Sequence, residues 1–103
     1  MATQPDSTEP DYVEKLHTLP GHMHSAMRLY IERGYRPGSF LSAVLCNDLM
    51  EAIGRADDAN VRALNAYAIY LYNYAPSACY GSPDKYDAWV QAGGLVGRES
   101  AAA

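Results

Sequence analysis

Proline and glycine residues divide this chain into short segments, and apolar residues recur at helical spacing within those segments. Pro76 and the Pro37-Gly38 pair interrupt the pattern, because proline lacks an N–H and disfavours the α conformation of the residue before it. Gly34 and Gly93 stand where periodic segments end, a position that favours a left-handed backbone. Only short helices fit between these breaks. The sequence therefore predicts an all-α fold, a compact bundle of four to five short helices.

The predicted helices differ in how well their ends are marked. The last begins with Ser82 as its N-cap, Pro83 at its first position and Asp84 in its first turn. The third carries apolar residues on more than one face, so we expect it to be central and largely buried. Residues 67–74 also fit an alternating strand pattern, but the helix-period residues just upstream favour a continued helix. The predicted helices are residues 11–18, a segment within 19–35, residues 39–53, residues 58–74 and a segment within 81–94.

The length of 103 residues leaves room for one domain with one core. Residues 1–10 combine proline, serine, threonine and acidic residues, so we expect them to form a flexible tail. We expect a single helical domain over residues 11–96 and a disordered C-terminus over residues 97–103. The last three alanines have no periodic role and are interpreted as a remnant of an expression vector.

The charge balance argues against direct binding of nucleic acid. Twelve acidic and eight basic residues give a net charge of −4, whereas nucleic-acid binding depends on Lys and Arg. Cys46 and Cys79 form no CxxC motif, which is typical of a protein from a reducing compartment. The polar N-terminus has no signal-peptide pattern, and no apolar run is long enough to span a membrane. We therefore expect a soluble, intracellular protein without a membrane partner.

No residue pattern indicates an enzyme, a metal site or a cofactor site. His17, His22 and His24 are clustered, but they lack the i, i+4 spacing that brings two imidazoles to one metal. Cys46 stands among apolar helix positions, where a thiol behaves as a small hydrophobic group. Phosphate-loop, nucleophile-elbow and dinucleotide motifs do not occur, and so short a chain leaves little room for a ligand pocket of about 300 Å3. We expect a non-enzymatic protein with no cofactor and no metal.

Polar and acidic residues lie within and after the third predicted helix. Asn47 and Asp48 either make structural hydrogen bonds or form a functional acidic spot, because unpaired burial would cost about 1–3 kcal/mol each. Glu51, Asp57 and Asp58 form the densest negative patch of the sequence. One aspartate of the pair is expected to cap the next helix. The patch is also a candidate contact for a basic partner.

Nine tyrosines dominate the aromatic residues, and three of them share one face of the fourth predicted helix. Tyr67, Tyr70 and Tyr74 recur at helical spacing. Two interpretations remain open: these phenols cover a neighbouring helix, or they are partly exposed and bind a partner. The expected core face on the opposite side consists of Val61, Leu64, Ala68 and Leu71, with Tyr72 at its edge.

Three motifs carry a resemblance to a known family. The chain reads R-P-G-x-F-L-x-A-V-L-x-N-D-L over residues 36–49, G-R-A-D over 54–57 and G-S-P-x-x-x-x-A-W over 81–89. With these motifs it resembles small phage-encoded anti-CRISPR proteins, in particular the helical inhibitors of type I-F surveillance complexes. The resemblance spans roughly residues 21–95 and rests on turn, cap and core residues rather than on a catalytic signature.

The resemblance implies a monomer that acts in the host bacterial cytoplasm, binds the RNA-guided complex and keeps target DNA from its binding path. The chain has no long acidic run, and arginines interleave with its acidic residues, which favours steric wedging at a subunit junction over full mimicry of DNA charge. The alternatives are a small phage helix-turn-helix regulator that binds DNA, with residues 58–74 as its second helix, and a phage accessory protein. The candidate partner-binding residues are Glu51, Asp57, Asp58, Tyr67, Tyr70, Tyr74, Asp84 and Asp87.

Overall fold

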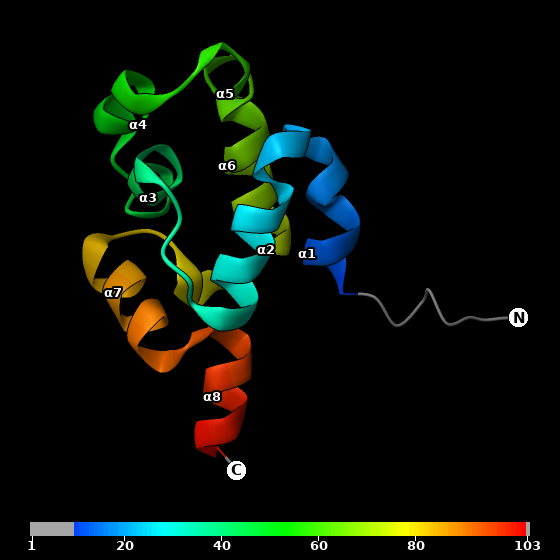
Figure 1. Cartoon of the computed structure of the whole chain (residues 1–103), viewed down its shortest axis with the longest axis vertical. Helices are drawn as coiled ribbons and strands as arrows, with labels where there is room; N and C mark the ends of the chain where they lie inside the picture. The colour runs from blue at the N-terminus through cyan, green and yellow to red at the C-terminus, as the bar shows by residue number, and fades with distance from the viewer. Residues whose placement is uncertain (1–9, 103) are drawn as a thin grey trace, which may run out of the picture.

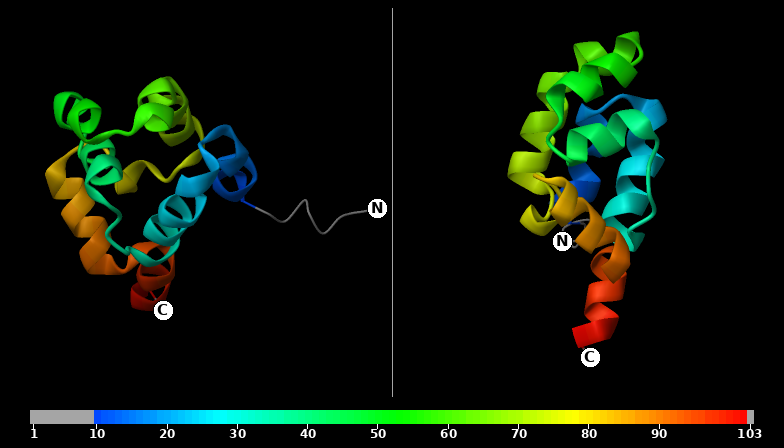
Figure 2. Two further views of the ribbon diagram at one scale, coloured as in Figure 1. Left: turned by 45° about the horizontal axis from the view of Figure 1, so that its top comes forward. Right: turned by 90° about the vertical axis from the view of Figure 1, so that its left-hand side faces the viewer.

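Helices form the architecture of residues 10–102, the part of the chain that the computed structural model describes. The described residues contain no β-strand, so the all-α prediction is confirmed, although the helices are shorter and more numerous than predicted. Figures 1 and 2 show how they pack around one another, with α1 and α8 at the outside. The helices are α1 (Asp11–Glu14), α2 (His24–Arg33), α3 (Ser39–Leu45), α4 (Leu49–Arg55), α5 (Asp58–Arg62), α6 (Leu64–Tyr74), α7 (Pro83–Ala92) and α8 (Gly94–Ala102), with short 3-10 turns at Lys15–Thr18, Gly21–Met23 and Ser77–Cys79.

The predicted ends of α2 and α7 are confirmed. The hydroxyl oxygen of Ser82 accepts a hydrogen bond from the Lys85 N–H (3.2 Å), and Pro83 follows at the first position of α7. Gly34 and Gly93 end α2 and α7 with φ angles of 71° and 81°, in the left-handed conformation that favours glycine. Local signals therefore suffice to define these two helices.

The third predicted helix is in fact two helices, α3 and α4, because the chain turns at Asn47. Asn47 has a left-handed backbone with φ of 64°, and its N–H donates to the Val44 oxygen (3.0 Å). The Asp48 N–H donates to the Ala43 oxygen (2.9 Å), which completes a Schellman ending of α3. The Asp48 side chain then caps α4 by accepting the Glu51 N–H (3.2 Å). The prediction of one continuous helix is wrong, and the structural interpretation is confirmed for the Asp48 side chain, which caps α4.

This turn separates a buried helix from an exposed one. In α3, Phe40, Leu41 and Leu45 are buried in the core. In α4, Leu49 is 60% exposed and Ile53 is 43% exposed, because α4 packs chiefly against α3 and not against the rest of the bundle. The expectation of a central, largely buried helix therefore holds for α3 and is wrong for α4.

The fourth predicted helix is also divided, into α5 and α6, and its expected core face is buried only in part. Tyr67 and Tyr70 are fully buried, which confirms for these two the interpretation that the phenols pack inside. On the expected core face, Leu71 is buried but Ala68 is exposed, and Tyr72 at its edge is 81% exposed. This side of α6 is therefore divided: Leu71 and Leu64 pack against the core, and Ala68 is exposed.

Buried aromatic side chains connect segments that are far apart in the sequence. A phenol hydroxyl buried without a partner would cost about 1–3 kcal/mol, and each of these has an acceptor. The bonds tie α2 to α7 and to the turn after α6, and they tie α6 to α1. The hydroxyls of Tyr30, Tyr67 and Tyr70 donate to the Cys79 oxygen (2.6 Å), Asn60 Oδ1 (2.7 Å) and the Tyr12 oxygen (2.5 Å), and the Trp89 indole N–H donates to the Tyr30 oxygen (2.9 Å).

The start of α8 is held by a close contact between two glycines. Gly34 and Gly94 have φ angles of 71° and 69°. A Cβ placed on Gly94 would lie 2.6 Å from the backbone nitrogens of Arg33 and Gly34, which is closer than real side chains approach. Only glycine permits this approach, and it holds α8 against the end of α2 (Figure 1).

The structure describes the C-terminal end of the chain almost completely, but it leaves most of the N-terminal end undescribed. Residues 97–102, which were expected to belong to a disordered C-terminus, lie in α8, and residue 103 is outside the described residues. The flexible tail predicted for residues 1–10 lies, except for Pro10, outside the described residues.

Replacing Gly94 by alanine tests the glycine contact. We expect Gly94→Ala to lower the free energy of unfolding by about 1–3 kcal/mol, because the methyl group would overlap the backbone at the end of α2. Gly54 of α4 is the control: a Cβ there meets no atom within 4 Å, so Gly54→Ala should raise stability by about 0.5–1 kcal/mol. Urea unfolding followed by circular dichroism measures both. Equal midpoints for Gly94→Ala and the parent chain would contradict the contact.

The buried phenols predict that the protein loses stability at alkaline pH. Burial raises the pKa of Tyr30, Tyr67 and Tyr70 well above the ordinary value of 10.0 and raises the pKa of the Cys79 thiol from 9.0 to about 12. The unfolded chain therefore releases these protons first, so the free energy of unfolding should fall above about pH 9 for the thiol and about pH 10 for the phenols.

The free energy of unfolding should fall by about 1.4 kcal/mol per pH unit for each group that ionises only in the unfolded chain. Urea titrations at increasing pH, followed by circular dichroism, measure this slope. A free energy of unfolding that stays constant above about pH 10 would contradict the burial of these groups. Tyr67→Phe should reduce the slope by one group.

Candidate functional site

The acidic candidates do not form one surface. Three of the five carboxylates each have a cationic or imidazole neighbour. The other two, Asp58 and Asp84, are exposed in the first turns of α5 and α7. Asp84 and Asp87 belong to α7, whereas Glu51 belongs to α4 and Asp57 and Asp58 stand at the start of α5. The paired carboxylates are Glu51 with Arg55 (2.7 Å), Asp57 with His22 (3.1 Å) and Asp87 with Arg36 (3.6 Å).

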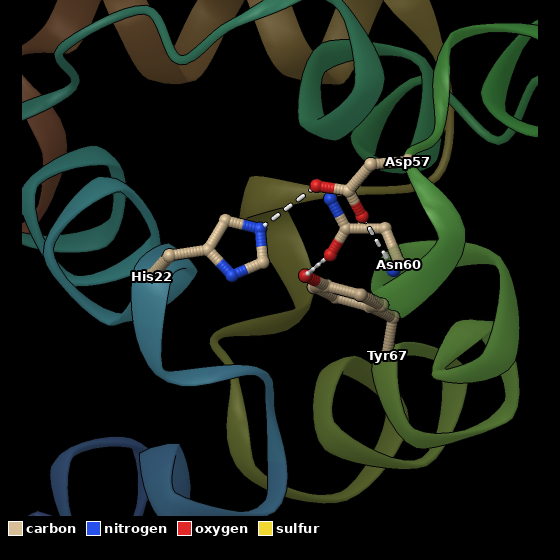
Figure 3. Close-up of polar contacts among 4 residues, drawn as sticks. All are labelled: His22, Asp57, Asn60 and Tyr67. Atoms are coloured by element: carbon tan, nitrogen blue, oxygen red, sulfur yellow. Dashed lines mark hydrogen bonds and ion pairs between the residues drawn. The ribbon is translucent and has the colours of Figure 1, made fainter.

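Asp57 has a structural role at the start of α5, as Figure 3 shows. Its Oδ1 accepts the Asn60 N–H (2.8 Å), and its Oδ2 lies 3.1 Å from Nε2 of His22. The Asn60 N–H is the main cause that holds the pKa of Asp57 below its ordinary value of 3.8, and His22 adds to it. Asn60 in turn accepts the hydroxyl of the buried Tyr67. The expected helix cap is therefore confirmed, and it is linked to the core.

The tyrosine candidates are mostly removed from the surface. Tyr67 and Tyr70 are fully buried, so the interpretation that they form an exposed partner-binding face is wrong for this structure. Tyr74 is half-buried, packs against the Tyr70 ring and has the Lys15 ammonium 5.5 Å from its ring centroid. Of the three, only Tyr74 presents part of its side chain to solvent.

The surface feature best suited to a ligand is a groove of about 440 Å3 between α4 and α6. This volume overturns the expectation that the chain has little room for a site of about 300 Å3. In Figure 1, α4 lies beside α3, and α6 stands across from them. The lining residues are Val44, Asn47, Asp48, Leu49, Ala52, Leu64, Ala68, Leu71, Tyr72, Tyr80 and Gly81.

The groove exists because the turn at Asn47 directs α4 away from the bundle while the rest of its lining stays fixed. Ala52 and Leu71 are buried in the lining, and the small side chain of Ala68 leaves the space beside them unfilled. The end of the groove near Gly81 is held by its N–H, which donates to the Leu45 oxygen at the end of α3 (2.8 Å).

Exposed apolar side chains gather at this groove. Leu49 and Tyr72 line it with exposed fractions of 60% and 81%. Met50 and Ile53 extend the exposed apolar surface along α4, and Met50 is 77% exposed. A contiguous apolar surface of this kind is typical of an interaction site, whereas single exposed apolar residues are ordinary.

The lining is suited to binding rather than to acid–base or metal chemistry. Asp48 is the one carboxylate among the lining residues, and the lining contains neither histidine nor cysteine. Among the described residues, no group of three or more His, Cys, Asp or Glu side chains is arranged to hold a metal ion. An apolar floor with a polar end formed by Asn47 and Asp48 matches the usual composition of a recognition site.

Sequence reasoning missed the residues that line this groove. It placed Leu49 and Ala68 in the core and Tyr72 at the edge of the core, because their spacing is helical and apolar. One signal was available: asparagine tolerates a left-handed backbone, so Asn47 followed by Asp48 could have been interpreted as the end of one helix and the cap of the next.

Comparison with protein-family models, with curated proteins and with solved structures finds no match to this chain. Over residues 10–102, none of the helices has the length and apolar character needed to cross a membrane.

Two tyrosines on α6 test the assignment of core and surface. Tyr70→Ala should lower the free energy of unfolding by about 3–5 kcal/mol, because it empties a fully buried site and removes the donor to the Tyr12 oxygen. Tyr72→Ala should change it by less than about 0.5 kcal/mol, because the side chain is largely in solvent. Chemical denaturation of the two variants measures the difference. Similar losses in both would contradict the orientation of α6.

Proposed function

We propose that this chain is a non-enzymatic inhibitor that binds the type I-F RNA-guided surveillance complex and keeps target DNA from its binding path. The observation that carries the proposal is the apolar groove between α4 and α6, with Leu49, Met50 and Tyr72 exposed around it. A groove of this composition supports binding of another protein, which the inhibitors that the chain resembles require. The choice of the surveillance complex as the partner comes from that resemblance.

Charge supports a protein partner over a nucleic acid. The chain has a net charge of −4, and residues 58–74, the second helix of the alternative helix-turn-helix, contain Arg62 as their one Lys or Arg. A DNA-binding helix needs such residues to contact phosphates and base edges. The exposed face of α6 offers apolar and amide side chains instead, among them Ile69, Tyr72 and Asn73.

The mode of inhibition that fits this surface is steric. A partner segment in the groove would desolvate the apolar side chains at the centre of the interface, which usually supply most of the binding energy. Exposed carboxylates nearby, such as Glu51 and Asp58, would guide the approach to a basic surface. The chain would act as a monomer, one copy to each blocked site, in the cytoplasm of the host bacterium.

Gel filtration with the purified type I-F complex tests this proposal. The chain should co-elute with the complex and abolish its binding to target DNA. Tyr72→Glu should weaken the association about tenfold or more, because it places a charge in the apolar groove. Tyr35→Glu is the matched control, since Tyr35 is 59% exposed but lies outside the groove, between α2 and α3.

Independent elution of the parent chain and the complex would contradict the proposal. A salt-sensitive mobility shift with bare duplex DNA would favour the helix-turn-helix regulator. A stable homo-oligomer that binds neither the complex nor DNA would favour the phage accessory protein.

A further inference from the structure

The walls of the groove show what shape of partner segment fits it. On α6, Leu64, Ala68, Leu71 and Tyr72 line the groove at spacings of four, three and one residues, which together form one helical stripe. On α4, Leu49 and Ala52 line the opposite wall at a spacing of three. Two helical walls with side chains in rows of three and four present the ridges and grooves into which a third helix packs.

The charge at one end of the groove shows which chemistry the segment must carry. Asp48 is the one charged residue of the lining, and its Oδ1 accepts the Glu51 N–H at 3.2 Å. Among residues 10–99, no Lys, Arg or His side chain forms an ion pair with Asp48. Lys85 lies beside Gly81, but its ammonium donates to the Ser77 oxygen (3.4 Å). The groove therefore offers an exposed carboxylate to a cation from outside.

We infer that the groove accepts an amphipathic α-helix of the partner that carries Lys or Arg beside its apolar stripe. The apolar stripe packs between α4 and α6, and the cation meets the carboxylate of Asp48 and the exposed amide of Asn47 at the end of the groove. This inference rests on the proposed function insofar as the helix belongs to the surveillance complex.

A second copy of the chain suits the groove less well than a basic helix. A symmetric dimer through this surface brings the same residues of both copies together, so each interface would contain two copies of Asp48. Each chain also has a net charge of −4, so the copies repel each other. A basic amphipathic helix is attracted by the same charges.

Synthetic peptides provide the probe. The first is a helical peptide of leucine and lysine with one apolar stripe. The second replaces each lysine by glutamate, and the third has the composition of the first in an order that forms no stripe. Amide NMR spectra of the full chain locate the binding. We expect the first peptide to shift Ala52, Ala68 and Gly81 and to bind at least tenfold more tightly than the other two.

Two matched substitutions test whether the peptide is attracted by the carboxylate in the groove or by the acidic charge of the chain in general. Asp48→Asn keeps the cap of α4, because asparagine caps as well as aspartate, and it should weaken the leucine–lysine peptide about 3- to 10-fold. Glu14→Gln removes an equal charge from α1, outside the groove lining, and should leave the affinity unchanged. Tyr72→Glu should abolish the shifts in the groove.

The outcomes divide clearly. Equal affinity for the glutamate peptide, equal losses from Asp48→Asn and Glu14→Gln, or shifts outside the groove would overturn the inference. A dimer seen by sedimentation, together with amide shifts of Ala52 and Ala68 that depend on the concentration of the chain, would overturn it as well. If the peptide binds in the groove but the chain does not co-elute with the surveillance complex, the proposed function is rejected. The inference that the groove accepts a basic helix is then retained. Co-elution that Tyr72→Glu does not weaken would reject the groove and keep the proposed function.

Discussion

The hydroxyl group of each buried tyrosine needs an acceptor, and this requirement determines how the helices are arranged. Tyr30 reaches the Cys79 oxygen and Tyr70 reaches the Tyr12 oxygen, so hydrogen bonds position the turn after α6 and the first helix. Apolar packing alone has no such direction, whereas a hydrogen-bonded phenol specifies one neighbour at one distance. Hydrogen bonds between polar atoms therefore determine the arrangement of the core as much as the packing of apolar side chains does.

The outward surface follows from the inward one. Because Tyr67 and Tyr70 occupy the core, part of the opposite side of α6, with Ala68 and Tyr72, faces outward. The turn at Asn47 sends α4 to the opposite side of the same space. The groove between α4 and α6 therefore results from two separate features of the sequence: the tyrosines that pack in the core and the asparagine at which α3 ends.

The sequence allows prediction of those features that depend on a few neighbouring residues. The caps at Ser82 and Gly93 are local, and both were predictable. The turn at Asn47 was harder, because a polar residue in an apolar helix pattern fits either an interior hydrogen bond or a helix end. The orientation of α6 could not be decided, because both of its faces are apolar enough to be buried. Only the positions of acceptors such as the Tyr12 oxygen decide between the faces.

The attachment of α4 has a consequence for motion. This helix packs chiefly on α3 and is joined to it by the turn at Asn47, so few contacts oppose its opening. The surrounding core, which contains Tyr30, Tyr70 and Trp89, opens only when the chain unfolds globally. The amides of α4 should therefore exchange with solvent sooner than those of α2 or α7. An occupant of the groove that packs against α4 should slow this exchange.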